Sequence, residues 1–204
     1  MADTIETPHG PARVHRSDPV GPVRAFLMLG HGAGVGIDTP DLVAVTEAAV
    51  ATGITVCRVE QPFRVAGRRA PAPARQLDAA WHAVVAAVPR PAGVPLVVGG
   101  RSMGARVACR TAATVGAAAV LCLAFPAHPP RRPDRSRLTE LAAVRVPVLV
   151  VQGDRDPFGM PPSAPGRMVH VVPGADHALR VDPVGMAEVV ASWLLRTVRP
   201  LPMP

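Results

Sequence analysis

The sequence predicts an α/β protein built as a three-layer, doubly wound, mostly parallel sheet. Short runs of apolar residues recur along the chain, and each run is bounded by glycine, proline or charged residues. Segments in which apolar residues have helical spacing separate most of these runs. Because the runs lack polar alternation, we expect strands that are buried on both faces, as in a parallel sheet covered by helices on both sides.

The segments that we interpret as strands share a short length, β-branched or aliphatic residues, and turn-forming residues at their ends. They are residues 24–29, 54–59, 95–99, 118–124, 146–151 and 168–172. The polar segment before them contains at most one short edge strand, around residues 12–15.

The helices are predicted from capping residues and from apolar stripes. Asp38 or Thr39 caps the first helix, which has Pro40 at its first position. In the second helix, Leu77 and Trp81 begin an apolar stripe. Helices are expected over residues 40–50, 75–88, 102–115, 138–144 and 183–198, and loops over 30–36, 60–74 and 125–135.

Length and composition favour one globular domain. The chain has 204 residues, of which 49% are hydrophobic and 18% are charged, which is enough apolar material for a sizeable core. Residues 1–22 are polar and rich in proline, so we expect a flexible N-terminal segment there and a single domain over residues 23–204.

The N-terminal segment, the apolar runs and the cysteines together predict a cytoplasmic protein without membrane attachment. The N-terminal segment has no apolar signal region, and no apolar run reaches the length of a spanning helix. Cys57, Cys109 and Cys122 lie in apolar segments and form no Cys-x-x-Cys pair, so we expect buried, reduced thiols rather than a disulfide or a metal site.

The formal charge of +7 does not by itself indicate a nucleic-acid partner. All 22 basic residues are arginine, and aromatic residues make up only 3% of the chain, which leaves little to stack on bases. We therefore expect no nucleic-acid binding and interpret the arginines as solvated loop charge. They cluster at Arg64, Arg68, Arg69 and Arg75, and at Arg131, Arg132, Arg135 and Arg137.

A nucleophile elbow is the clearest chemical motif. Gly100-Arg-Ser-Met-Gly104 follows a predicted strand and opens a predicted helix, the context that the Gly-x-Ser-x-Gly pattern requires. Small residues flank the serine because the turn is tight and neighbouring backbones pass close. This pattern predicts Ser102 as a nucleophile.

A serine nucleophile needs a base, and the base needs an acid that orients it. His177 follows the last predicted strand, and Asp154 and Asp156 follow the strand before it. In a parallel sheet these loops meet at the carboxyl edge, in the order Ser, Asp, His. Either aspartate can orient the imidazole of His177, and we prefer Asp156 from its place in the loop. Asp176 adjoins His177 and is expected to brace the loop.

An oxyanion hole is expected from two main-chain N–H groups. Met103 follows the nucleophile, and Ala33 lies in the glycine-rich loop after the first central strand. The rival interpretation of that loop, a dinucleotide-binding turn, lacks the third glycine, and a Walker loop requires a lysine that the chain does not contain. Further residues that can line the site are His31, Arg101 and His128.

With these motifs in this order, the chain resembles the α/β-hydrolases. Within them it is similar to the small, lidless, dienelactone-hydrolase-like group, and to the hydrolase-like domains of a testis-expressed protein and of a nonspecific-lethal histone-acetyltransferase complex subunit. The segments around Phe125 and Asp156 carry the narrower likeness. The resemblance implies a minimal α/β-hydrolase fold without a lid, with Ser102 as nucleophile, Asp156 as acid, His177 as base, and Ala33 and Met103 as oxyanion donors.

The function that follows is serine hydrolysis of a carboxylic ester or related acyl compound, with an acyl-enzyme intermediate and no cofactor. Dienelactone hydrolases themselves have cysteine where this chain has Ser102. The alternative is a non-catalytic interaction or scaffolding module, since the narrower group includes scaffolding subunits.

Overall fold

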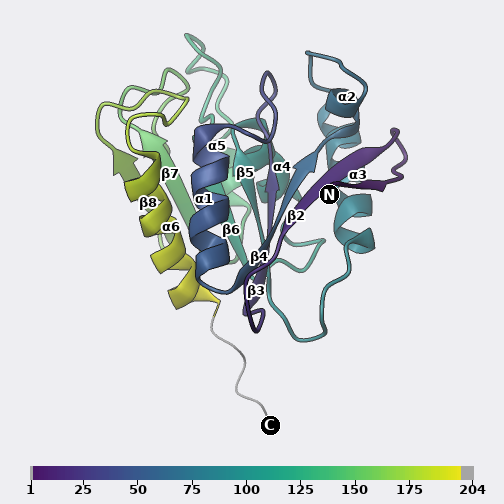
Figure 1. Ribbon diagram of the computed structural model, residues 1–204. Helices are drawn as coiled ribbons and strands as arrows, with labels where there is room; N and C mark the ends of the chain where they lie inside the picture. Colours follow the sequence, from purple (N-terminus) through teal and green to yellow (C-terminus); the bar gives the residue numbers. More distant parts are fainter. Residues whose placement is uncertain (1, 199–204) are drawn as a thin grey trace.

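The computed structural model describes residues 2–198 and folds them around one eight-stranded sheet (Figure 1). The strand order is β1-β2-β4-β3-β5-β6-β7-β8; β1 and β2 are antiparallel to their neighbours, and the other pairs are parallel. The strands are β1 (Ala2–Ile5), β2 (Ala12–Ser17), β3 (Ala25–Gly30), β4 (Ile54–Glu60), β5 (Leu96–Arg101), β6 (Ala119–Leu123), β7 (Val148–Gly153) and β8 (Arg167–Val172). The doubly wound α/β fold is confirmed, and the last six residues of the predicted domain, 199–204, lie outside the described residues.

Helices cover both faces of the sheet. On one face α1 (Pro40–Ala51) and α6 (Pro183–Thr197) lie side by side, in front of the sheet in Figure 1. On the opposite face lie α3 (Ala74–Ala87), α4 (Met103–Thr111) and α5 (Leu138–Ala142). The molecule therefore has the three layers that the sequence predicted.

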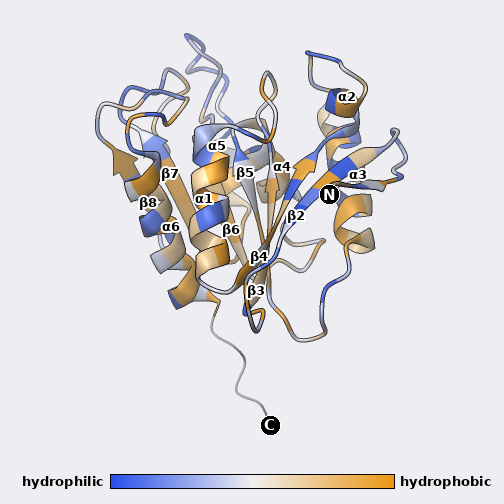
Figure 2. Cartoon of the chain, in the orientation of Figure 1, coloured by the Kyte–Doolittle hydropathy of each residue, from blue (hydrophilic) through white to orange (hydrophobic). Residues whose placement is uncertain are grey.

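Side chains of the central strands alternate between two apolar layers. In β3, Phe26 and Met28 pack toward α3 and α4, whereas Leu27 and Leu29 pack toward α1 and α6. Figure 2 shows the strands as mostly hydrophobic and the loops above them as largely hydrophilic. Burial of one such side chain stabilises the fold by about 1.5–3 kcal/mol, which explains why these strands contain so few polar residues.

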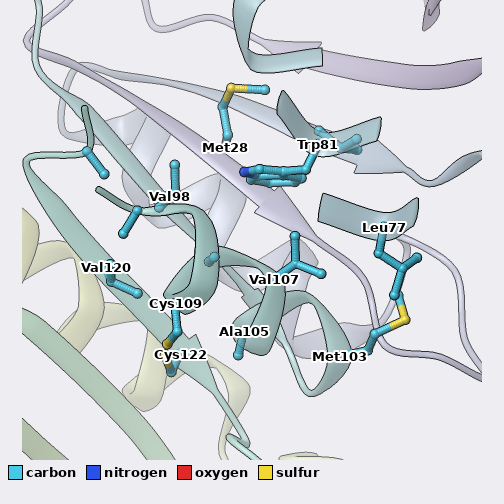
Figure 3. Packing of buried hydrophobic residues seen from close by; sticks show 14 of the residues in the cluster. Met28, Leu77, Trp81, Val98, Met103, Ala105, Val107, Cys109, Val120 and Cys122 are labelled. Carbon is cyan, nitrogen blue, oxygen red and sulfur yellow. Dashed lines mark hydrogen bonds between the residues drawn. The ribbon is translucent and has the colours of Figure 1, made fainter. Parts of the chain in front are cut away.

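The layer behind the sheet is closely packed around the helix that carries the nucleophile motif (Figure 3). There the indole of Trp81 lies beside Met28, and the side chain of Met103 reaches Leu77. Cys109 and Cys122 face each other with their Sγ atoms 3.5 Å apart, and together with Cys57 they are free, buried cysteines. Burial raises the pKa of the Cys57 thiol to about 11.

The N-terminal segment is a correction to the sequence analysis. Residues 1–22 were expected to be flexible and to lie outside the domain, but β1 and β2 form a hairpin whose second strand pairs with β4. The reason is visible in β2, where Ala12 and Val14 point into the core and Arg13 faces solvent. This alternation is short, and it suits an antiparallel strand with one buried face. The strand expected around residues 12–15 is therefore β2, and the edge of the sheet is β1.

One helix was not predicted, and another ends earlier than predicted. The expected loop over residues 60–74 contains the four-residue helix α2 (Pro62–Val65), whose Phe63 is buried. The helix expected to continue to residue 115 ends as α4 at Thr111 and is followed by turns.

Nothing resembling a lid lies over the carboxyl edge of the sheet within residues 2–198. Residues 124–147, between β6 and β7, contain only the five-residue helix α5 and loops. These loops and those after β3, β4, β7 and β8 gather at the top of Figure 1. None of the helices described is long and apolar enough to cross a membrane.

Candidate active site

Ser102 occupies a tight turn between β5 and α4. Its φ of 53° lies in the left-handed region, which non-glycine residues rarely adopt, and its N–H donates to the carbonyl of Leu123 at 2.9 Å. A Cβ on Gly100 or Gly104 would overlap the carbonyl oxygen of Gly30. Ser102 is the N-cap of α4 but its hydroxyl makes no capping bond, so the hydroxyl is available for other partners.

His177 lies between the hydroxyl and a buried carboxylate. Its Nε2 is 2.8 Å from Oγ of Ser102, and its Nδ1 is 2.8 Å from Oδ2 of Asp156. A carboxylate can only accept, so Nδ1 carries the proton and the lone pair of Nε2 faces the hydroxyl. The structure thus brings together three residues that are up to 75 positions apart in the sequence.

The carboxylate of Asp156 is buried and fully supported by donors. Oδ1 accepts from the N–H of Phe158 at 2.8 Å, and Oδ2 accepts from Nε2 of Gln152 at 2.8 Å in addition to His177. Asp154, the other candidate acid, is exposed and its Oδ1 accepts instead from the N–H of Gly174. Of the two aspartates, only Asp156 touches the imidazole.

The glycine-rich loop after β3 runs beside the serine. A Cβ on Gly32 would lie 3.7 Å from Cβ of Ser102, so the loop and the hydroxyl are neighbours. Ala33 follows in this loop and is half-buried, and Met103 is the first residue of α4, where a helix leaves its N–H without an intrahelical acceptor. The loop is tied to α4 because the N–H of Gly104 donates to the carbonyl of His31.

The buried side chain of His31 supports this loop and does not line the open site. Its side chain is buried; Nε2 accepts from the N–H of Gln61 at 3.1 Å, so Nδ1 carries the proton and donates to the carbonyl of Gly32 at 2.7 Å. Burial lowers the pKa of His31, which keeps the ring neutral. Its expected role in lining the site is therefore wrong, since a buried ring cannot contact a substrate.

Arg101 and His128 contact the segments that carry His177 and Asp156, which together with Ser102 form the candidate triad. Nη2 of Arg101 donates to the carbonyl of His177 at 2.8 Å from a buried position. His128 is half-buried, its N–H donates to the carbonyl of Phe158, and the ring of Phe158 stacks on that of His177. Both residues thus contact loops of the triad, and the expectation that they line the site stays a prediction.

Sequence analysis missed two residues that touch the triad. Gln152 and Phe158 flank Asp156 in the loop after β7, one as a donor to its carboxylate and the other stacked on His177. The signal available was their place beside the candidate acid, because a buried carboxylate needs donors close in sequence or space.

No side-chain cluster suggests a metal centre. Within residues 2–198, no group of three or more His, Cys, Asp or Glu residues is placed to hold an ion.

Most of the clustered arginines lie in α2, in the loop after it, or in the loop between β6 and α5.

Comparison of the sequence with family models gives one match. Residues 23–186 match the model of an alpha/beta hydrolase domain family. No curated protein matches the chain significantly.

Solved structures with the same fold cover nearly the whole chain. An α/β serine hydrolase without a lid, from Xanthomonas campestris, is 22% identical and superimposes with a TM-score of 0.78, covering 99% of this chain and 96% of its own. Est1E from Butyrivibrio proteoclasticus is 17% identical (TM-score 0.76; 97% of this chain, 98% of its own). A dienelactone hydrolase from Anabaena variabilis is 16% identical (TM-score 0.74; 98% of each chain). At these low identities, the TM-scores show a shared fold.

Proposed function

Because the chain belongs to the alpha/beta hydrolase domain family, we propose that it is a serine hydrolase that cleaves a carboxylic ester or a related acyl compound. Ser102 is the nucleophile, His177 the general base, and Asp156 the acid that orients the base. The observation that carries the proposal is the pair of 2.8 Å contacts, from Nε2 of His177 to Oγ of Ser102 and from Nδ1 to Oδ2 of Asp156.

Acylation begins with the hydroxyl of Ser102. As Oγ forms a bond to the carbonyl carbon of the substrate, its proton passes to Nε2 of His177, and the carbonyl electron pair moves onto oxygen. The imidazolium that forms is stabilised by the carboxylate of Asp156, which stays ionised. The side-chain amide of Gln152 and the main-chain N–H of Phe158, which donate to its two oxygens, hold this carboxylate in position.

The negative charge on the tetrahedral intermediate needs donors that are already in place. We assign this role to the N–H groups of Met103 and Ala33, one at the start of α4 and the other in the loop beside Ser102. The positive end of the α4 dipole adds to the stabilisation at Met103.

Collapse of the intermediate completes the first half of the reaction. The carbon–oxygen bond to the leaving alcohol breaks, the proton on Nε2 passes to that alcohol, and the acyl group stays on Oγ as an ester. Water then attacks this ester with His177 again as base, which releases the carboxylic acid and returns the proton to Ser102. Side chains and main-chain N–H groups of the chain carry out each step.

Ester substrates are favoured by what is known of the structural neighbours. Est1E has been solved with ferulic acid bound, and another neighbour is a dienelactone hydrolase. The absence of a lid over the described carboxyl edge suits acyl compounds that enter from solvent without a gating step.

The proposal is tested with a fluorophosphonate probe, which reacts with activated serines and needs no knowledge of the substrate. Intact mass and peptide mapping are expected to show one adduct, on Ser102, that is lost in Ser102→Ala and strongly reduced in His177→Ala. Labelling that persists in Ser102→Ala would contradict the proposal. No labelling of folded protein would favour the alternative, an interaction module that keeps the fold without catalysis.

A further inference from the structure

A buried ion pair lies directly behind the proposed triad. It joins Arg101, the residue before the nucleophile, to Asp41 in the first turn of α1, with Nε 3.0 Å from Oδ2. The side chain of Arg101 is 9% exposed and that of Asp41 is 0% exposed. No other ion pair between the described residues is buried to this degree on both sides; the nearest, between His177 and Asp156, has side chains that are 18% and 0% exposed.

The guanidinium of Arg101 contacts three parts of the site at once. Nε lies 3.0 Å from Oδ2 of Asp41, and Nη2 donates to the main-chain carbonyl of His177 at 2.8 Å. Nη1 lies against the glycine-rich loop after β3, where a Cβ on Gly32 would come within 2.9 Å of it. Its own main chain is covalently joined to Ser102. Arg101 therefore connects the nucleophile, the loop that carries the base, and the loop that carries an oxyanion donor.

Asp41 is placed to hold this guanidinium and does little else. Among the described residues, 2–198, no group donates a well-aligned hydrogen bond to its carboxylate oxygens, and Arg101 is its one ionic partner. Its position in the first turn of α1 favours a negative charge there.

Stability alone does not explain such a pair. Taking both charges out of water costs roughly as much as their attraction returns, and apolar residues of similar size often stabilise a core equally well. What apolar residues cannot do is donate to the carbonyl of His177. The bond from Nη2 to this carbonyl is thus the contact for which a side chain with a donor is needed.

We propose that Arg101 is a positioning residue for the general base: held by Asp41, it fixes the main chain at His177 so that the imidazole stays within reach of Ser102. Asp156 and Phe158 hold the ring, and Arg101 holds the backbone that carries the ring. A displacement of about 1 Å in such a group can lower a rate by about 10²-fold. The inference rests on the proposed function, because it assigns Arg101 a role in the same reaction.

Four variants separate the effect of Arg101 on the placement of His177 from its effect on the stability of the fold. Arg101→Met removes the donor and leaves Asp41 unpaired, whereas the double variant Asp41→Asn/Arg101→Met also removes the stranded charge. The controls are Arg110→Met and Asp78→Asn/Arg110→Met, which treat in the same way a more exposed ion pair that joins α4 to α3 and contacts no triad residue. Glu140, the second partner of Arg110, keeps its ion pair with Arg106 in both controls.

Three quantities are measured for each variant: the second-order rate constant for fluorophosphonate labelling, the thermal midpoint, and the low-field proton resonance of Nδ1–H of His177, assigned by its loss in His177→Gln. Arg101→Met is expected to be labelled at least tenfold more slowly than wild type and to lose or broaden the resonance. In the double variant the thermal midpoint recovers but the labelling rate does not. The Arg110 controls keep the wild-type rate and resonance.

A labelling rate that recovers together with the thermal midpoint in Asp41→Asn/Arg101→Met would overturn the inference, because Arg101 would then act only through stability. If the wild-type chain is not labelled at all, the proposed function fails and the resonance decides. Loss of the resonance in Arg101→Met but not in Arg110→Met would still support the ordering of His177 by Arg101. Its retention in Arg101→Met would overturn that too.

Discussion

The phenyl ring of Phe158 stacks on the imidazole of His177, with ring centroids 4.1 Å apart and planes inclined by 31°. An aromatic face attracts a cation, so this contact becomes stronger when the imidazole takes up a proton. The stack therefore restrains the ring and, in the proposed mechanism, favours the imidazolium that forms as Ser102 attacks.

Replacing Phe158 by Ala is expected to lower the labelling rate of Ser102 about three- to tenfold, which corresponds to roughly 0.7–1.4 kcal/mol of barrier. Phe158→Leu keeps an apolar contact but lacks the aromatic ring, so its labelling rate should lie between those of wild type and Phe158→Ala. Met160→Ala, at an exposed position in the same loop, serves as control. A wild-type rate in Phe158→Ala would show that the stack has no part in catalysis.

Gln152→Leu removes the Nε2 donor to Asp156 and the bond to the carbonyl of Gly159. A buried carboxylate that loses a donor is held less firmly, so we expect slower labelling and a loss of about 1.5–3 kcal/mol in the free energy of unfolding. Denaturant titration measures the second effect. Gln76→Leu, at an exposed position on α3, should change neither quantity. Equal stability of Gln152→Leu and wild type would rule out the support that we assign to this amide.

Gly104→Ala places a methyl group against the main chain of Gly30, where the added Cβ would overlap the carbonyl oxygen. Because neither backbone can move without disturbing β3 or α4, we expect a loss of about 1–3 kcal/mol and reduced labelling of Ser102. Gly36→Ala is the matched control, since its Cβ would meet no atom within 4 Å. Unfolding midpoints and labelling rates of the two variants test the prediction, which fails if they are alike.

The pH dependence of stability should contain a contribution from His31. Burial lowers the pKa of this histidine in the folded chain, so below the unfolded pKa of about 6.5 the unfolded chain binds a proton that the folded chain does not. Stability from this group is therefore present above that pH and declines as the pH falls toward the lowered folded value. Unfolding free energies between pH 8 and pH 5 should decline less steeply in His31→Gln than in wild type. Parallel slopes for His31→Gln and wild type would refute the assignment.

The central part of the fold was predictable because its signals are strong and local. Strands such as β3 and β5 are apolar on both faces, so their runs are unmistakable, and Pro40 and Pro183 mark helix starts. A short strand was expected where β2 lies, but β1 and the hairpin that it forms with β2 were missed, because β2 has one buried face and places only Ala12 and Val14 in the core. Its stability comes from pairing with β4, which no local pattern reveals.

The candidate site was predictable as a set of loops and less so as a set of contacts. Parallel strands bring the loops that hold Ser102, Asp156 and His177 to one edge, which follows from topology alone. The choice between Asp154 and Asp156, the stacking of Phe158, and the burial of His31 depend on side-chain directions that the sequence pattern does not encode. The cytoplasmic location and the lack of a nucleic-acid partner stay predictions.

The wide separation of the triad along the chain also matters while the protein is being synthesised. The nucleophile turn is complete once β5 and α4 have been made, but its partner His177 lies 75 residues later and follows β8, the strand at the far edge of the sheet. In the proposed mechanism, a nascent chain that ends before β8 has the nucleophile but lacks the base. Reactivity at Ser102 is therefore expected to appear only after β8 and the loop that carries His177 have joined the sheet. Incomplete chains on the ribosome should thus not react at this serine.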